Sequence, residues 1–169
     1  MRLILAFLLL CGIVAANGCS KDPADNNTDE TNLYTDAAMY QEISNGSFYY
    51  YQSDTATLTA AGNSPHGAFK LLFNQEAKNA LGTDGKLAVG DTFPAGSIVL
   101  KDVIRNGTTR FYAAMWKQPA SSNTNEDWLW YEANLDGSLL ESITTKGSGC
   151  IGCHRANANR DFINSFDLH

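Results

Sequence analysis

The sequence has few of the residues that bind metals or form covalent cross-links. Its 169 residues include four cysteines, three histidines and three methionines. Cys11 lies in an apolar leader and Cys19 directly follows that leader, so only Cys150 and Cys153 remain for the folded part of the chain. These two are three positions apart and carry a motif of their own, which leaves no cysteine for a structural disulfide. We therefore expect the apolar core and a bound group to stabilise the fold.

Basic residues are also scarce. The chain has 12 lysines and arginines against 18 acidic residues, a formal net charge of −6. Removal of Arg2 with the leader would leave 11 basic against 18 acidic residues, a charge of −7. An acidic surface repels phosphate groups, which argues against nucleic acid and anionic lipid as partners.

No apolar run is long. The longest, residues 3–14, falls short of the roughly 20 apolar residues that a transmembrane helix needs. Arg2 precedes the run and small residues follow it, which is typical of an export signal over residues 1–18. The signal leads through Asn17-Gly18 into Cys19 and resembles a bacterial lipoprotein cleavage site, which predicts that Cys19 is lipidated. Asn17 departs from the small residue usual at its position, so cleavage by ordinary signal peptidase is the alternative.

The remainder of the chain divides into a polar segment and one domain. Residues 19–32 are rich in Asn, Asp and Thr, have no apolar periodicity and predict a disordered tether. Residues 33–169 have the length of a single domain with a sizeable core. We expect a cell-envelope protein, periplasmic or anchored at the outer membrane, that meets the membrane only through an N-terminal lipid.

The most informative motif lies near the carboxyl end. Cys150, Cys153 and His154 have the spacing Cys-x-x-Cys-His, which is typical of c-type haem attachment. Two thiols three positions apart can each add to one vinyl group of the same porphyrin. The histidine that follows is then held where its imidazole can bind the iron. The motif predicts one covalently attached haem c per chain, with His154 as the proximal iron ligand.

Three other interpretations of the cysteine pair exist: a thioredoxin-like redox dithiol, a plain disulfide, or half of a zinc site. The dithiol would require a preceding strand in a parallel α/β setting, whereas a Ser-Gly loop precedes Cys150. The zinc site would require a further pair of Cys or His ligands, which the sequence does not offer. Haem attachment is the interpretation that the motif favours.

The apolar patterns predict an α+β fold dominated by β-structure: an antiparallel sheet of hairpins with short peripheral helices. Asn106-Gly107 between two apolar runs is a strong hairpin signal, because both turn residues must adopt positive φ. This order of elements excludes an ordinary small cytochrome c, which is helical. Strands are expected at 66–73, 96–105, 109–117, 127–134 and 138–144, an extended stretch at 47–53, and helices at 37–43, capped by Asp36, and 74–81.

Several short stretches together resemble the cytochrome P-460 family, which includes the haem-c proteins called cytochromes c-prime-beta. The resemblance runs from about Ser64 to Phe166. It is carried by His66-Gly67, Phe73-Asn74, the run from Gly96 to Lys101, Asp127-Trp128, and the haem motif followed by Arg160-Asp161-Phe162.

The resemblance implies a largely antiparallel β fold, often a homodimer, with one haem per subunit. Family members include hydroxylamine-oxidising enzymes and proteins that bind nitric oxide. The enzymes carry an extra covalent bond from a strand lysine to the haem edge, and Lys101 is the best match. It shares a strand face with Val99 and Val103, where a lysine is costly unless it is paired or chemically used. Partial solvation of that face is the alternative, and Lys70 is a weaker candidate.

The number of histidines and methionines limits which residues could occupy the second axial position of the iron. Besides His154, the mature chain offers only His66, His169, Met39 and Met115. A structural hydrogen bond is expected for His66, core packing for Met115 and a loose terminal position for His169. The sequence therefore predicts an iron whose other face is open to small ligands.

Phe69 and Phe93 are candidates to shield that face, and Glu132 is the most plausible proton acceptor beside the iron. The expected function is an exported c-type haem protein that binds or redox-processes small nitrogen species such as nitric oxide or hydroxylamine. Whether it is an enzyme depends on a bond between Lys101 and the haem. The alternative is a periplasmic electron-transfer cytochrome, and either function would use a redox partner protein.

Overall fold

The computed structural model describes residues 33–59 and 64–169. The predicted export signal, the tether of residues 19–32 and the lipidation site Cys19 lie outside the described residues. Within the described part, no helix is long and apolar enough to cross a membrane.

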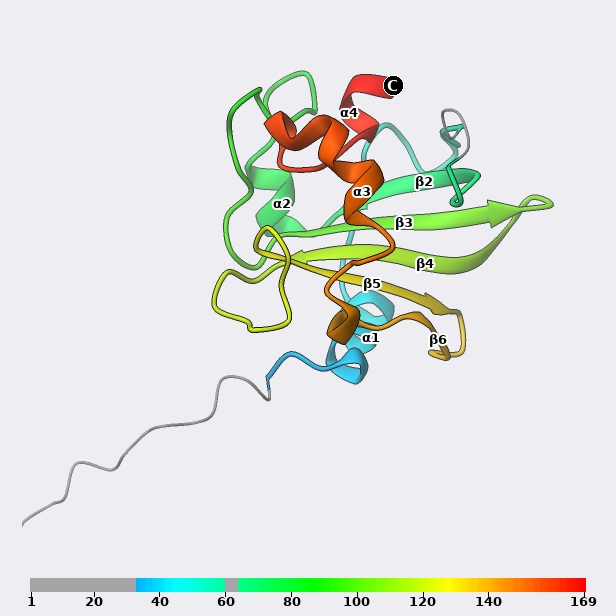
Figure 1. Cartoon of the computed structure of the whole chain (residues 1–169). Coiled ribbons are helices and arrows are strands. Elements are labelled where there is room, and N and C mark those ends of the chain that lie inside the picture. Colours follow the sequence, from blue (N-terminus) through cyan, green and yellow to red (C-terminus); the bar gives the residue numbers. More distant parts are fainter. Residues whose placement is uncertain (1–32, 60–63) are drawn as a thin grey trace, which may run out of the picture.

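The domain is built on one six-stranded antiparallel sheet (Figure 1). Strands that follow one another in the chain are neighbours in the sheet, in the order β1-β2-β3-β4-β5-β6. The predicted antiparallel, β-dominated α+β class is thereby confirmed. The strands are β1 (Tyr49–Tyr50), β2 (Ala68–Phe73), β3 (Ile98–Arg105), β4 (Thr108–Lys117), β5 (Trp128–Asn134) and β6 (Leu139–Glu141).

The central hairpin joins β3 to β4 through the predicted turn. Asn106 and Gly107 both have positive φ, 53° and 78°, which matches the twist of the flanking strands. One irregularity between Val103 and Ile104 shifts the register of the two strands by one residue. Lys101 consequently lies opposite Ala113 in β4, and Ala113 lies opposite Glu132 in β5. This β-bulge places Lys101 and Glu132 in one row across the sheet.

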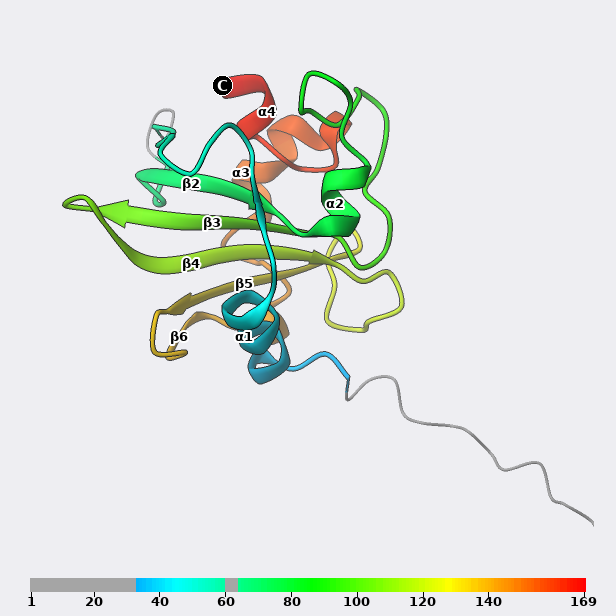
Figure 2. The same cartoon turned by 180° about the vertical axis from the view of Figure 1, so that it is seen from behind.

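Short helices flank the sheet on both faces. Figures 1 and 2 show α1 on one face and α3 on the opposite face. The helices are α1 (Asp36–Asn45), α2 (Gln75–Asn79), α3 (Ile151–His154) and α4 (Ser165–Leu168), with 3₁₀ turns η2 (Ile143–Thr145) and η3 (Arg155–Arg160).

The predicted cap of α1 is wrong by one residue. The hydroxyl of Thr35, not the carboxylate of Asp36, accepts the hydrogen bond from the backbone N–H of Ala38, at 3.1 Å. Asp36 instead accepts hydrogen bonds from Ser142 and from the N–H of Ile143, at 2.7 and 2.9 Å, and so ties α1 to the segment after β6. The α2 helix is capped by Asn74, whose side-chain oxygen accepts a hydrogen bond from the N–H of Ala77 at 3.0 Å.

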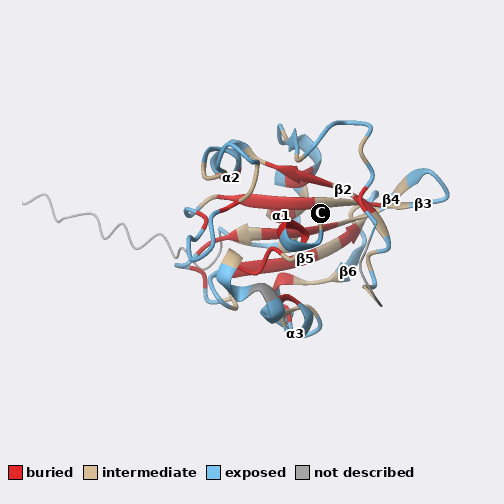
Figure 3. Cartoon of the chain, turned by 90° about the horizontal axis from the view of Figure 1, so that it is seen from above, coloured by how far each residue is buried: buried red, intermediate tan, exposed pale blue. Residues whose placement is uncertain are grey.

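Each face of the sheet has its own apolar core. On the α1 face, Met39 and Ile43 pack against side chains that include Leu129 and Tyr131. On the α3 face, residues after the motif, among them Phe162 and Phe166, pack against the aromatic side chains of β2 and β5. Figure 3 shows buried residues along the central strands. The Cys-x-x-Cys-His motif therefore lies over a sheet face that is apolar.

Candidate functional site

The motif segment is held on the sheet between two left-handed corners. It begins at Lys146 and Gly147, with φ of 54° and 62°, and it ends at Asp161 and Phe162, with φ of 49° and 70°. A Cβ at Gly147 would lie 2.3 Å from Cγ of Trp130, so only glycine fits there. Residues other than glycine rarely adopt this conformation, and the surroundings must over-determine it.

His154 lies at the end of α3, and its ring is oriented by the backbone. Its Nδ1 lies 2.7 Å from the carbonyl oxygen of Phe162. A carbonyl can only accept, so Nδ1 carries the proton and donates it, and Nε2 retains its lone pair. The edge of the Trp130 ring packs against the imidazole, with ring centroids 5.0 Å apart. This is the tautomer that a metal-binding histidine requires.

The protonation state of His154 also suits metal binding. Burial lowers its pKa to about 4; the charge of Lys101 and, more weakly, His66 also lower it, while the bond to the Phe162 carbonyl acts in the opposite direction. The imidazole is therefore neutral near pH 7, the form that can bind a metal.

The two cysteines are free thiols, Cys150 half-buried and Cys153 exposed. Burial, reinforced by the carboxylates of Glu132 and Glu141 and by Cys153, raises the pKa of Cys150 to about 12. A redox dithiol works through a depressed thiol pKa, so this environment disfavours the thioredoxin-like interpretation. Among residues 33–59 and 64–169, no group of three or more His, Cys, Asp or Glu side chains could hold a metal ion by itself. The zinc interpretation therefore gains no set of ligands from the described residues.

The motif borders a cavity of about 300 Å³, a volume within the usual range for small-molecule sites. Cys150, Cys153 and His154 form part of its wall, and Lys101 and Glu132 form another part. The structure thus brings the predicted haem-binding residues and the two predicted catalytic residues to one cavity. The remaining wall comprises Ser64, Pro65, His66, Phe69, Gly149, Asn164, Ser165, Leu168 and His169.

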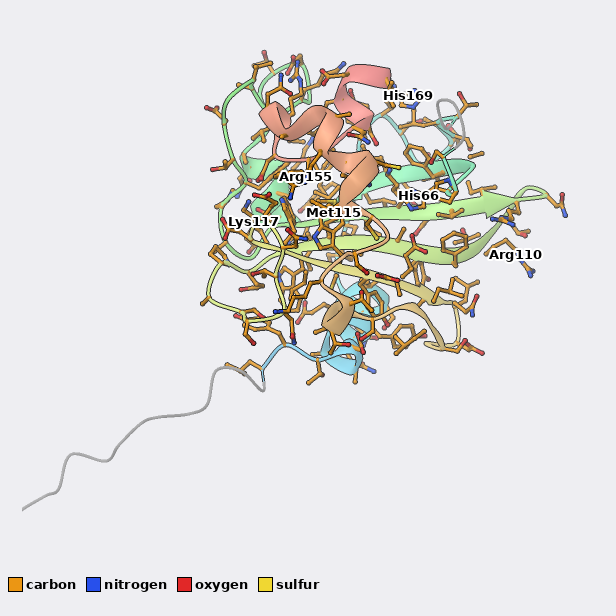
Figure 4. The ribbon with its side chains drawn as sticks, in the orientation of Figure 1. His66, Arg110, Met115, Lys117, Arg155 and His169 are labelled. Carbon is orange, nitrogen blue, oxygen red and sulfur yellow. The ribbon has the colours of Figure 1, made fainter. Side chains whose placement is uncertain are left out.

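His66 connects the two predicted catalytic candidates. Its Nε2 lies 2.9 Å from Oε1 of Glu132, and its Nδ1 lies 3.5 Å from Nζ of Lys101. Its ring centroid is 6.5 Å from that of His154, and Figure 4 labels it at the start of β2. The expected hydrogen bond of His66 is confirmed, but its place in the cavity wall was missed. No periodicity signals it, because His66 lies just before a strand.

Lys101 projects from β3 on the motif side of the sheet, as its alternation with Val99 predicts. Its ammonium lies over the Phe69 ring, 4.6 Å from the centroid. Burial lowers the pKa of Lys101 to about 8, and the carboxylate of Glu132 partly offsets that effect. A substantial fraction of this amine is therefore neutral and nucleophilic in mildly alkaline solution.

Two weaker candidates lie elsewhere. Phe93 packs in the core against Phe73 and Phe166, with its ring centroid 6.4 Å from each of theirs. It does not line the cavity, so its predicted shielding role is wrong. Lys70 hydrogen-bonds the carbonyl of Asp54, away from the cavity. Phe69 does line the cavity, as predicted.

The other candidate axial ligands lie on different faces of the sheet. Met39 projects from α1 into the core on the opposite face of the sheet and is fully buried. Met115 is buried in the core on the motif side, and it lines a small pocket together with His154. The prediction that His169 is loose is wrong. Its carbonyl accepts a hydrogen bond from Lys86 at 2.6 Å, and its ring packs edge-on against Phe69 at 6.0 Å. His169 lines the cavity. Its Nε2 is buried and has no hydrogen-bond partner among the described residues.

Comparison with protein-family models and with curated proteins finds no match to this chain. The likeness to the cytochrome P-460 family therefore stays a prediction from the motifs.

Proposed function

We propose that this protein is an exported c-type haem protein whose iron binds or redox-processes small nitrogen species such as nitric oxide or hydroxylamine. One observation carries the proposal: both motif cysteines, a neutral histidine with a free Nε2, a lysine and a glutamate line the same cavity. The likeness of its motifs to the cytochrome P-460 family supports the same conclusion.

The residues fit a covalent haem. Cys150 and Cys153 would hold the porphyrin by thioether bonds, and His154 would bind the iron through Nε2. The Nε2 of His169, which is buried and has no hydrogen-bond partner among the described residues, is consistent with a cavity that receives a further group. When bound, the haem would supply an iron centre that binds small ligands and exchanges electrons.

Whether the protein only binds small ligands or also converts them would depend on residues beside the haem. Glu132 can accept a proton, and His66 joins it by hydrogen bonds to the amine of Lys101. In the proposed enzymatic form, Lys101 is covalently joined to the haem edge and the protein is a hydroxylamine-type oxidoreductase. Without that bond, it is a binding protein for small ligands.

The alternative is a periplasmic electron-transfer cytochrome without substrate turnover. Such proteins use two strong axial ligands. Met39 is unsuited because it lies on the far face of the sheet. The cavity beside His154 favours an open iron face and hence small-ligand binding.

The cellular setting is proposed from the sequence. Lipidation at Cys19 would anchor the domain in the cell envelope, at the periplasmic side or at the outer membrane. Residues 19–32 would then act as the tether. An envelope haem protein of this kind would exchange electrons with a partner protein, and the family likeness implies a homodimer.

The proposal is tested by titrating the purified holoprotein with nitric oxide and with hydroxylamine while the absorption spectrum is recorded. We expect a high-spin ligand-free spectrum that changes on binding. A low-spin, six-coordinate spectrum in both oxidation states, unaffected by either ligand, would contradict the open iron face.

The enzymatic form is tested by peptide mapping. If Lys101 is joined to the haem, the peptide that contains it is recovered linked to the motif peptide, and Lys101→Arg abolishes both that link and hydroxylamine oxidation while leaving nitric oxide binding. An ordinary c-type spectrum without the link would leave the binding function and remove the enzymatic one.

A further inference from the structure

A buried ion pair joins Lys117 to Asp161. Asp161 is the residue before Phe162, whose carbonyl orients His154. Lys117 lies at the end of β4 (Figure 4). Its exposed fraction is 4 %, and that of Asp161 is 2 %. Nζ of Lys117 donates to Oδ1 of Asp161 at 2.8 Å. The indole N–H of Trp128 donates to the same oxygen at 3.1 Å, and the backbone N–H of Phe93 donates to Oδ2 at 2.8 Å. Both oxygens of this carboxylate are therefore occupied.

The network fixes an unfavourable backbone conformation. Asp161 and Phe162 are consecutive left-handed residues, which a bulky side chain such as phenylalanine rarely tolerates. Three donors, from two strands and from the loop before β3, hold Asp161 in place, and the aromatic ring of Phe162 is packed in the core. The carbonyl of Phe162 is thereby aimed at Nδ1 of His154, 2.7 Å away.

An ion pair of this kind is not explained by stability alone. A buried pair loses its hydration, and apolar residues of similar size often serve the core equally well. Its position one residue from the carbonyl that binds His154 provides another reason for its presence. Hydrogen bonds to the second nitrogen of a metal-binding histidine fix its tautomer and raise its basicity.

We propose that Asp161, held by Lys117 and Trp128, is a positioning residue that sets the orientation and donor strength of His154 toward the haem iron. This inference rests on the proposed haem function, and it adds three residues that support the proximal iron ligand of that function. A firm Nδ1–H hydrogen bond strengthens the iron–histidine bond and stabilises the ferric state.

The test compares two substitutions of the same type in the holoprotein. Asp161→Asn keeps an oxygen acceptor and a residue type that tolerates left-handed φ, but it removes the charge that binds Lys117. Asp167→Asn is the matched control, because Asp167 forms an ion pair with Arg160 in the same carboxyl-terminal segment, at 2.7 Å, and takes no part in the hydrogen bonds from Lys117, Trp128 and Phe93 to Asp161. Both variants are compared with the unmodified protein by haem content, resonance Raman spectroscopy and redox titration.

We expect Asp161→Asn to retain one covalent haem while the ferrous iron–histidine stretching band moves to lower frequency and the reduction potential rises. Asp167→Asn should match the unmodified protein in both measurements. An Asp161→Asn holoprotein with unchanged band and unchanged potential would overturn the inference. A general loss of packing would not produce this pair of shifts in a correctly folded holoprotein.

If Asp161→Asn does not fold, Trp128→Phe decides, because it removes one donor to Asp161 and keeps an aromatic ring in the core. A smaller shift in the same direction supports the inference, and no shift overturns it. Failure of the proposed function is a different result: the unmodified protein would carry no covalent haem. In that case, nitrogen-15 NMR of the His154 imidazole tests the role of Asp161 without haem. We expect a single Nδ1–H tautomer in the unmodified protein and a mixture of tautomers in Asp161→Asn.

Discussion

The two faces of the sheet are built from the same strands but differ in what they bury. The α1 face is an apolar core, in which Met39, Leu129 and Tyr131 pack without a buried ion pair among the residues that the structure describes. The α3 face buries the Lys117–Asp161 pair, a neutral histidine and a lysine of lowered pKa. It also contains both left-handed corners of the motif segment.

The difference indicates a division of roles. Burying charged groups and strained backbone costs free energy that an apolar core does not lose. The α1 face therefore stabilises the domain, whereas the α3 face retains features that cost stability around the motif and the cavity. Predictions that separate the two faces test this division directly.

The largest effect is expected at the first left-handed corner. Gly147→Ala places a methyl group against Trp130 in a backbone conformation that alanine disfavours, and should lower the free energy of unfolding by about 4 kcal/mol. Gly149→Ala is the matched control, because a Cβ there would meet no atom within 4 Å. Urea unfolding of both variants measures the effect. Equal stabilities would mean that the Gly147 corner imposes no constraint.

A substitution in the core on the α1 face should lower the stability of the domain but leave the site on the other face intact. Leu129→Ala leaves a cavity in that core and should lower the free energy of unfolding by about 3 kcal/mol. Haem content and the spectrum of the folded fraction should stay unchanged, because Leu129 points away from the motif. A changed haem spectrum in this variant would show that the two faces are not independent.

His154 should make the haem-free protein sensitive to acid. Its pKa is about 4 in the folded protein, below the 6.5 of a freely hydrated imidazole, so unfolding takes up a proton between these two pH values. Stability should consequently fall by about 3 kcal/mol as pH decreases from 6.5 to 4, with no contribution outside that window.

The measurement is urea unfolding of the haem-free Cys150→Ser, Cys153→Ser protein at several pH values, with His154→Gln added as the control. The control should lack this part of the pH dependence. Holoprotein should lack it too, because the iron would occupy Nε2. An unchanged pH dependence after His154→Gln would show that another group is responsible.

The smallest effect concerns Lys101. Its pKa of about 8 predicts that the rate of acetylation at this residue, followed by peptide mass spectrometry in the haem-free protein, rises with a midpoint near pH 8. The carboxylate of Glu132 raises the pKa of Lys101, so Glu132→Gln should move the midpoint to lower pH. A midpoint that does not move, or that rises, would contradict the electrostatic link between these two residues.

Alternating apolar residues and the Asn106-Gly107 turn were sufficient to predict the central strands. The register was not predictable, because a bulge between Val103 and Ile104 leaves no mark in the pattern of apolar residues. That bulge places Ala113 opposite Lys101 and aligns Lys101 with Glu132. The two residues were therefore singled out separately, and their juxtaposition came from the fold.

The motif residues were recognisable because their spacing is local. The contacts around them join segments that are distant in the chain, and no local pattern predicts which residues meet. Asp161 has the sequence character of a polar loop residue, yet it is buried by Lys117 and Trp128. His169 was expected to be loose, but contacts with Lys86 and Phe69 fix it. Such tertiary contacts cannot be inferred from periodicity.

The central claim is that Cys150 and Cys153 bind one haem covalently. Its most direct test is the intact mass of the exported protein under denaturing conditions, beside the Cys150→Ser, Cys153→Ser variant. The account predicts the added mass of one haem on the unmodified chain, carried by the peptide with both cysteines, and none on the variant. A haem-free unmodified chain, or covalent haem retained by the variant, would contradict it.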